Sequence, residues 1–128
     1  MRYLLDTHVL LWAAATPEKL SRSVIAQLED PSNQLYFSAA SIWEIAIKNG
    51  LNRTDFKVDT MQFRQQLLEN EYEEIPITSG HAVFTQALAN HHSDPFDRIL
   101  IAQAWVEDMT LITADDQVKR YVGPIQKI

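Results

Sequence analysis

Two acidic positions directly follow short apolar segments that are typical of buried strands. Asp6 follows residues 2–5, and the pair Asp115 and Asp116 follows residues 110–113. In a parallel α/β sheet, ligand sites form beyond the carboxyl ends of the strands. Aspartate is also a favoured helix N-cap, and both positions precede predicted helices. Each position could therefore cap a helix, take part in a site, or do both.

A third acidic position lies in the segment Asp94-Pro95-Phe96-Asp97, which has the features of a helix start. Asp94 suits the N-cap and Pro95 suits the first helical position. Asp97 is harder to explain in this way, because the helix that follows is apolar almost all round and is therefore predicted to be buried. A carboxylate on a buried helix is costly unless it has a partner, and a metal ion is one candidate.

Glu44 lies in a predicted helix whose apolar residues cover a wide arc of its surface. The remaining polar strip also contains Lys48, four residues later. An exposed Glu–Lys pair at this spacing contributes only about 0.3–0.5 kcal/mol. The helical wheel alone favours a surface pair, although the strip is narrow enough for Glu44 to face a cleft instead.

Other catalytic motifs are missing from the sequence. The four histidines form no His-x-x-His or Glu-x-x-His pair that would indicate a zinc site, and we interpret them as surface or packing residues. The chain has no Gly-x-Ser-x-Gly motif and no Gly-rich phosphate loop. It also has no cysteine, so a metal would have to be held by oxygen or by histidine nitrogen.

The elements that must position these acids alternate between short apolar strands and helices. Such alternation is typical of a parallel α/β sandwich, and 128 residues is an ordinary length for one domain. The predicted strands are residues 2–5, 34–37, 74–77 and 110–113, with a candidate edge strand at 124–128. The predicted helices are residues 7–15, 21–28, 38 or 41 to 48, 60–70, 79–89, 94–107 and a short turn at 115–121.

Composition narrows the function classes. Apolar residues make up 46% and charged residues 22%, as in ordinary globular proteins. No apolar stretch approaches the roughly 20 residues that span a bilayer, and no export signal is visible, so we expect a cytoplasmic protein with no membrane contact. The formal net charge of −6 argues against a broad basic surface for nucleic acid. A nucleic-acid function would need bound cations or a local basic patch.

Four segments, at residues 4–12, 41–48, 92–104 and 111–115, together resemble the PIN-domain ribonucleases, most closely the VapC-type toxins of bacterial toxin–antitoxin pairs. Their order and spacing match along essentially the whole chain. The resemblance implies a single PIN domain over residues 1–128. It also implies a PIN-like three-layer α/β/α sandwich with a short central parallel sheet.

The resemblance also implies a set of site residues. The acidic positions of the family fall on Asp6, Glu44, Asp97 and Asp115, of which Asp6, Asp97 and Asp115 are the expected metal ligands. Thr113 matches a hydroxyl that supports the last acid. Asp115 is preferred to Asp116 because it directly follows the Thr-Ala after the strand. Asp94 is expected nearby, as a helix cap rather than a ligand.

The expected chemistry follows from these groups. Carboxylates that are held together repel one another unless cations neutralise them, and hard oxygen ligands favour Mg²⁺ or Mn²⁺. Such ions could activate water for hydrolysis of an RNA phosphodiester bond, which would make the chain a metal-dependent endoribonuclease. A basic rim could assist substrate binding, with Arg98, Lys48, Arg53 and Lys57 as its candidates. The resemblance further implies a homodimer and a cognate VapB-like antitoxin that blocks the site.

Two other functions remain open. A non-catalytic binding module could keep the same fold, but the intact acidic set argues against it. A phosphate-transfer domain of the receiver or phosphatase kind would also gather aspartates at strand ends. Such domains need an aspartyl nucleophile and a well-placed lysine, whereas Asp6-Thr7-His8 lacks the second aspartate of the usual phosphatase motif and no lysine follows a predicted core strand.

Overall fold

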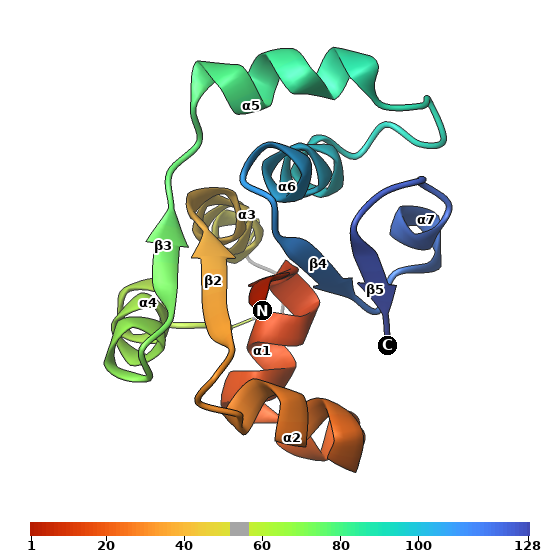
Figure 1. The fold of residues 1–128 in the computed structure, drawn as a ribbon. Helices are drawn as coiled ribbons and strands as arrows, with labels where there is room; N and C mark the ends of the chain where they lie inside the picture. Colours follow the sequence, from red (N-terminus) through yellow and green to blue (C-terminus); the bar gives the residue numbers. More distant parts are fainter. Residues whose placement is uncertain (52–56) are drawn as a thin grey trace.

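A central sheet of parallel strands organises the computed structural model (Figure 1). The model describes residues 1–51 and 57–128, so Arg53, a candidate for the basic rim, lies outside the described residues. The strands of the described part are β1 (Arg2–Leu5), β2 (Gln34–Ser38), β3 (Glu73–Ile75), β4 (Thr110–Thr113) and β5 (Ile125–Lys127).

The order of the strands in the sheet is β3-β2-β1-β4-β5, and every neighbouring pair is parallel. The central strand β1 therefore pairs with β2 on one side and with β4 on the other. The register of β1 and β4 places Leu5 beside Ile112, so the two strands end at the same level. This is a topological switch point, where parallel α/β sheets form a crevice for ligands.

Helices fill the connections between the strands. Several begin with an aspartate, serine or threonine whose side chain accepts a hydrogen bond from the first turn. The helices of the described part are α1 (Thr7–Ala15), α2 (Arg22–Glu29), α3 (Ala39–Gly50), α4 (Thr60–Glu69), α5 (Ser79–Phe84), α6 (Pro95–Val106) and α7 (Asp116–Lys119), with 3₁₀ turns at Pro17–Lys19 and Thr85–Ala87.

Side chains that alternate along the strands form a core on each face of the sheet. Leu4 and Leu111 pack with residues of α6 and α7 on one face. Leu5 and Ile112 pack with residues of α1, α3 and α4 on the other. Helix α5 lies across the outer side of α6 (Figure 1). The predicted three-layer α/β/α sandwich is therefore confirmed.

Some predicted boundaries were wrong. The third strand ends at Ile75 rather than at residue 77, because Pro76 has no N–H group to donate to a neighbouring strand. The helix predicted at 79–89 stops at Phe84 and continues as a 3₁₀ turn. Helix α6 is not buried to its end, since Trp105 and Val106 are each 44% exposed. Among the residues that the structure describes, no helix has the length and apolarity needed to cross a membrane.

Candidate active site

Asp6 is the first residue beyond β1, and its carboxylate is almost fully buried. Its Oδ1 accepts a hydrogen bond from the Val9 N–H at 3.0 Å, which caps α1, and its Oδ2 accepts one from the Thr113 hydroxyl on β4. Burial raises the pKa of Asp6 above its usual range, although the bonds from Thr113 and Val9 oppose the shift. Asp6 thus caps a helix, and burial makes ionisation of its carboxyl group unfavourable.

Thr113 links the ends of β1 and β4. Its side chain is fully buried, and the hydroxyl that donates to Asp6 also accepts a hydrogen bond from the Asp115 N–H at 3.0 Å. Asp115 in turn caps α7, with Oδ1 accepting from the Gln117 N–H at 2.7 Å. Asp116 is 94% exposed and lies 3.5 Å from the Lys127 ammonium. The structure therefore connects Asp115, and not Asp116, to Asp6.

Asp97 lies in the first turn of α6, where it is 20% exposed. Asp94 caps this helix as predicted, since its Oδ1 accepts from the N–H groups of Phe96 and Asp97. Burial is the main cause that raises the pKa of Asp97 to about 6. Oδ2 of Asp97 lies 3.0 Å from Nε2 of His92, a hydrogen bond that partly opposes this rise.

Three of the four predicted acids act on one another electrostatically. The negative charge of Asp115 raises the pKa of Asp6 and also that of Asp97. Asp94 adds to the effect on Asp97. Negative charge from several acids is therefore concentrated beyond β1 and β4, and the hydrogen bonds from Thr113 and His92 offset part of it.

Glu44 is joined by a hydrogen bond to Thr7, the residue next to Asp6. Its Oε2 lies 3.1 Å from the Lys48 ammonium, so the predicted i,i+4 pair is present. Its Oε1 accepts a hydrogen bond of 2.7 Å from the Thr7 hydroxyl, which also lies 2.9 Å from Ser41 Oγ. Only 13% of the Glu44 side chain is exposed. The helical wheel found the pair but not the inward contact with the residue next to Asp6.

Sequence reasoning missed several residues of this region. Ser41 and Glu44 share one face of α3 at i,i+3 spacing, and this signal could have suggested a common partner. His92 precedes Asp97 in a loop, where no periodicity predicts its orientation. His92 was interpreted as a surface or packing residue, whereas its two ring nitrogens contact Asp97 and the Tyr121 hydroxyl.

Two candidates for the basic rim, Lys48 and Arg98, make contacts within the protein. Lys48 pairs with Glu44. Arg98 donates hydrogen bonds to the carbonyl oxygens of Thr85 and Ala89 and to the Tyr121 hydroxyl, so its guanidinium holds the structure around α6. Arg98, a candidate for the basic rim, thus makes these hydrogen bonds within the protein. Lys57 is exposed.

The donor set suits a hard divalent cation. Asp6, Asp97 and Asp115 offer only carboxylate oxygens, and the raised pKa values of Asp6 and Asp97 show that positive charge would stabilise their ionised forms. Among residues 1–51 and 57–128, no three His, Cys, Asp or Glu side chains are already close enough to share one ion. Binding of one ion by all three would therefore require these side chains to move closer together.

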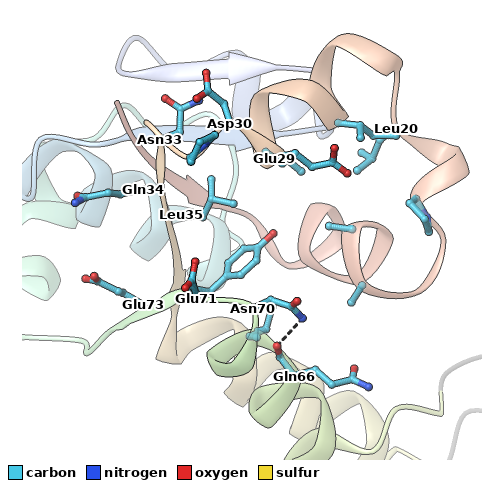
Figure 2. A pocket seen from close by; sticks show the side chains of 18 residues that line it. Leu20, Glu29, Asp30, Asn33, Gln34, Leu35, Gln66, Asn70, Glu71 and Glu73 are labelled. Atoms are coloured by element: carbon cyan, nitrogen blue, oxygen red, sulfur yellow. Dashed lines mark hydrogen bonds between the residues drawn. The ribbon is translucent and has the colours of Figure 1, made fainter.

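The clearest cavity lies elsewhere, at the amino ends of β2 and β3 (Figure 2). It has a volume of about 780 Å³ and is bounded by α1, α2 and the end of α4. Its lining includes Leu35 and Leu67 together with the acids Glu29, Glu71 and Glu73, and none of the described lining residues is basic. Its acids are exposed, and it includes none of Asp6, Glu44, Asp97 and Asp115, so the cavity is a feature separate from the strand-end acids.

The sequence is similar to known proteins along nearly its whole length. The family model for the PIN domain matches residues 3–124. Ribonuclease VapC22 from Mycobacterium tuberculosis is 30% identical over 122 residues, which cover 94% of this chain and 92% of that protein.

Solved structures show the same fold at low identity. VapBC2 from Rickettsia felis, bound to a DNA fragment from its promoter, matches with a TM-score of 0.73 and 16% identity, covering 99% of this chain and 98% of that one. VapBC-1 from nontypeable Haemophilus influenzae matches with a TM-score of 0.67 and 18% identity, with the same coverage of 99% and 98%. The arrangement of strands and helices described above is therefore shared with these proteins.

Proposed function

The chain belongs to the PIN-domain family, and from this we propose that it is an endoribonuclease that hydrolyses RNA phosphodiester bonds with the help of a divalent metal ion. The observation that carries the proposal is that the Thr113 hydroxyl joins Asp6 to Asp115 beyond the ends of β1 and β4, where the charge of Asp115 also acts on Asp97. The similarity to a ribonuclease over almost the whole chain indicates what such a group of acids does.

Asp6, Asp97 and Asp115 are the proposed ligands of Mg²⁺ or Mn²⁺ in this site. When bound, such an ion supplies positive charge for the phosphate and a means of activating water. Thr113 and the Val9 N–H hold the Asp6 carboxylate in one orientation. Asp94 caps the helix that carries Asp97. These contacts restrain the backbone and part of the side chain of two proposed ligands, and the side chains would still have to move closer together to share one ion.

Glu44 is the proposed fourth acid. Its two oxygens are held by Thr7 and Lys48, so it is oriented although it does not share a hydrogen bond with the other three. The protein carries a net charge of −6, and Lys48 and Arg98 are engaged within the structure. Attraction of the RNA phosphate therefore depends on the bound cation rather than on a basic surface.

The same proposal extends to partners. The sequence relative is named a VapC ribonuclease, and the structural neighbours are named VapBC complexes. We therefore infer that this chain is the toxin of a toxin–antitoxin pair. Residues 1–128 form one PIN domain that acts on cytoplasmic RNA, assembles as a homodimer and is restrained by a VapB-like antitoxin. Co-expression with the product of an adjacent small gene, followed by gel filtration, tests both assemblies.

Cleavage of RNA by the purified protein tests the catalytic proposal. Mg²⁺ or Mn²⁺ should support cleavage and EDTA should abolish it. Asp6→Asn and Asp97→Asn should each lower the rate by about a hundredfold or more, since each removes a ligand charge. Asp59→Asn is the matched control, because Asp59 is an exposed cap of α4 and asparagine caps equally well.

A fully active Asp6→Asn, Asp97→Asn double variant would overturn the proposal. Binding of RNA without cleavage under any metal condition would instead favour the non-catalytic module. Transfer of phosphate from acetyl phosphate to an aspartate would favour the phosphatase-like alternative, which the proposal excludes.

A further inference from the structure

Four side chains form a continuous line of hydrogen bonds that ends at Asp97. Oδ2 of Asp97 lies 3.0 Å from His92 Nε2, and His92 Nδ1 lies 2.8 Å from the Tyr121 hydroxyl. The same hydroxyl lies 2.9 Å from an NH1 nitrogen of Arg98. Of these four side chains, only Asp97 takes part in the proposed chemistry. The proposed function gives no role to His92, Tyr121 or Arg98.

The chemistry of the four groups determines which atom donates and which accepts in each hydrogen bond. A guanidinium only donates hydrogen bonds, so the Tyr121 oxygen must accept from Arg98. The single Tyr121 proton then has two acceptors, His92 Nδ1 at 2.8 Å and the His92 carbonyl at 3.3 Å, and the shorter contact favours the ring nitrogen. A neutral imidazole that accepts at Nδ1 carries its proton on Nε2. That proton faces Asp97, whose ionised carboxylate can only accept.

Arg98 and Tyr121, which lie at the end of the line away from Asp97, are fixed by further contacts. Arg98 also donates to the Thr85 carbonyl at 3.0 Å and to the Ala89 carbonyl at 2.9 Å, and its guanidinium lies 5.8 Å from the centroid of the Tyr121 ring. Tyr121 is buried in the core on the α6 side of the sheet. A permanently charged donor and a buried hydroxyl therefore approach His92 from fixed positions.

We propose that Arg98, acting through Tyr121, holds His92 in the tautomer with its proton on Nε2, and that this ring positions the Asp97 carboxylate by binding Oδ2 and leaving Oδ1 for a cation. His92, Tyr121 and Arg98 are thus positioning residues. In the described part of the chain, Oδ1 of Asp97 has no hydrogen-bond partner. The second half of the inference rests on the proposed role of Asp97 as a metal ligand.

Asp97 needs a positioning partner because its carboxylate can rotate about the last side-chain torsion. The last torsion of an aspartate is broad, so an unrestrained Asp97 would present either oxygen over a range of directions. A donor bound to one oxygen narrows this range. Partners that orient metal ligands typically contribute about 10–100-fold to metal affinity or activity.

The tautomer can be tested without metal or activity. Nitrogen-15 NMR of histidine side chains in the metal-free protein at alkaline pH distinguishes protonated from unprotonated ring nitrogens. The expected result for His92 is a protonated Nε2 and an unprotonated Nδ1. In an Asp97→Ala background, where the carboxylate no longer favours a proton on Nε2, Tyr121→Phe should shift the ring towards a mixture of tautomers. Tyr72→Phe is the matched control, since Tyr72 lines the cavity at the opposite edge of the sheet and should leave His92 unchanged. A protonated Nδ1 in the unaltered protein would overturn the inference.

Positioning is tested by the affinity for Mn²⁺, measured by calorimetry and checked against a folded circular dichroism spectrum. His92→Ala should weaken binding by about tenfold. His92→Gln should restore most of the loss, because its side-chain amide can donate where Nε2 did. Equal affinities for the alanine, glutamine and unaltered proteins would contradict the positioning role.

Failure of this inference is distinguishable from failure of the proposed function. If Asp97→Asn leaves Mn²⁺ binding and cleavage unchanged, Asp97 is not a ligand and the positioning role falls with it. If Asp97→Asn abolishes both whereas His92→Ala changes neither, the proposed function stands and the positioning role alone is wrong.

Discussion

The hydroxyl of Thr113, at the end of β4, donates a hydrogen bond to Oδ2 of Asp6, at the end of β1. Because the same hydroxyl accepts from the Asp115 N–H, one small side chain connects two acidic residues that lie just beyond the ends of neighbouring strands. A shift of β1 relative to β4 would break one of these bonds. The relative placement of Asp6 and Asp115 therefore depends on Thr113.

Replacement of Thr113 by valine should destabilise the protein by about 1–3 kcal/mol, because the buried Asp6 carboxylate loses a donor. The Thr113 bond lowers the pKa of Asp6 against the effect of burial, so its loss should raise this pKa further. The destabilisation should consequently be larger at pH 8 than at pH 4, as measured by urea unfolding. Thr110→Val, at the other end of β4, is the control. Equal losses at both pH values would show that the hydroxyl acts only through packing.

Asp97 should make the metal-free protein less stable as pH rises. The folded pKa of about 6 lies above the ordinary 3.8, so the folded state binds a proton more tightly than the unfolded state. This contribution to the free energy of unfolding is present below pH 4 and is lost between about pH 4 and 6. Asp97→Asn should remove the decline and be about 1–2 kcal/mol more stable at pH 8, after allowance for partial exposure.

Thermal melts in EDTA from pH 4 to pH 8 measure this effect, with the Asp59→Asn variant as the reference. Addition of Mn²⁺ should reverse the order, because an ion that binds only the folded state stabilises it by about 2.7 kcal/mol at a hundred times its Kd. A parallel pH profile for Asp97→Asn and the unaltered protein would argue against the raised pKa.

Asp115 and Asp116 should differ sharply despite being adjacent. Asp115→Asn retains a side chain that can cap α7, but it removes a charge that acts on Asp6 and Asp97. We expect a loss of cleavage of about tenfold to a hundredfold. Asp116→Asn removes only an exposed charge near Lys127 and should stay within about twofold. Initial rates of RNA cleavage compare the two, and a larger loss for Asp116→Asn would reassign the ligand.

Glu44→Gln should separate function from stability. Glutamine can still accept from Thr7 and has nearly the size of glutamate, so loss of the half-buried pair with Lys48 should change the free energy of unfolding by no more than about 1 kcal/mol. Cleavage should nevertheless fall by about tenfold or more if the fourth carboxylate belongs to the site. Glu74→Gln, which breaks the exposed pair with Arg64, is a matched control for both measurements. Unchanged cleavage in Glu44→Gln would remove Glu44 from the active site.

Gly123 should tolerate no larger residue without cost. A Cβ atom at this position would lie 2.8 Å from Nε1 of Trp105, so the indole would have to move. We expect Gly123→Ala to lower the free energy of unfolding by about 1–3 kcal/mol. Gly50→Ala meets no atom within 4 Å at the end of α3 and should be neutral or stabilising by up to about 1 kcal/mol. Denaturant unfolding of the two variants tests the contrast.

Local signals account for how well the sequence predicted the fold. The bounds of β1, α1 and β4 agree with prediction, because each is an apolar run that ends at a polar cap. The helix from Ser79 could not be bounded from its own residues. At its end, the Thr85 hydroxyl donates to the Ala82 carbonyl, and Arg98 of α6 donates to the Thr85 carbonyl. The contact from Arg98 depends on tertiary structure.

The candidate site divides in the same way. Asp6 and Asp115 could be predicted because strand ends are readable from the sequence, and Asp97 because its helix is apolar. Glu44 could not be derived from its helix, since its inward contact requires Thr7 to lie beneath α3. His92 could not be found either, because its loop is positioned by Tyr121 and Arg98 from later elements.

The pairing of β1 with β4 also governs when activity can arise during synthesis. The two partners in the Thr113–Asp6 bond are separated by 107 positions, so β1 leaves the ribosome long before β4 exists. Until then Asp6 lacks its donor and the charge of Asp115, and the central strand lacks one neighbour. A nascent chain that stops before Asp115 thus lacks part of the acidic group, and under the proposed mechanism it would not cleave RNA.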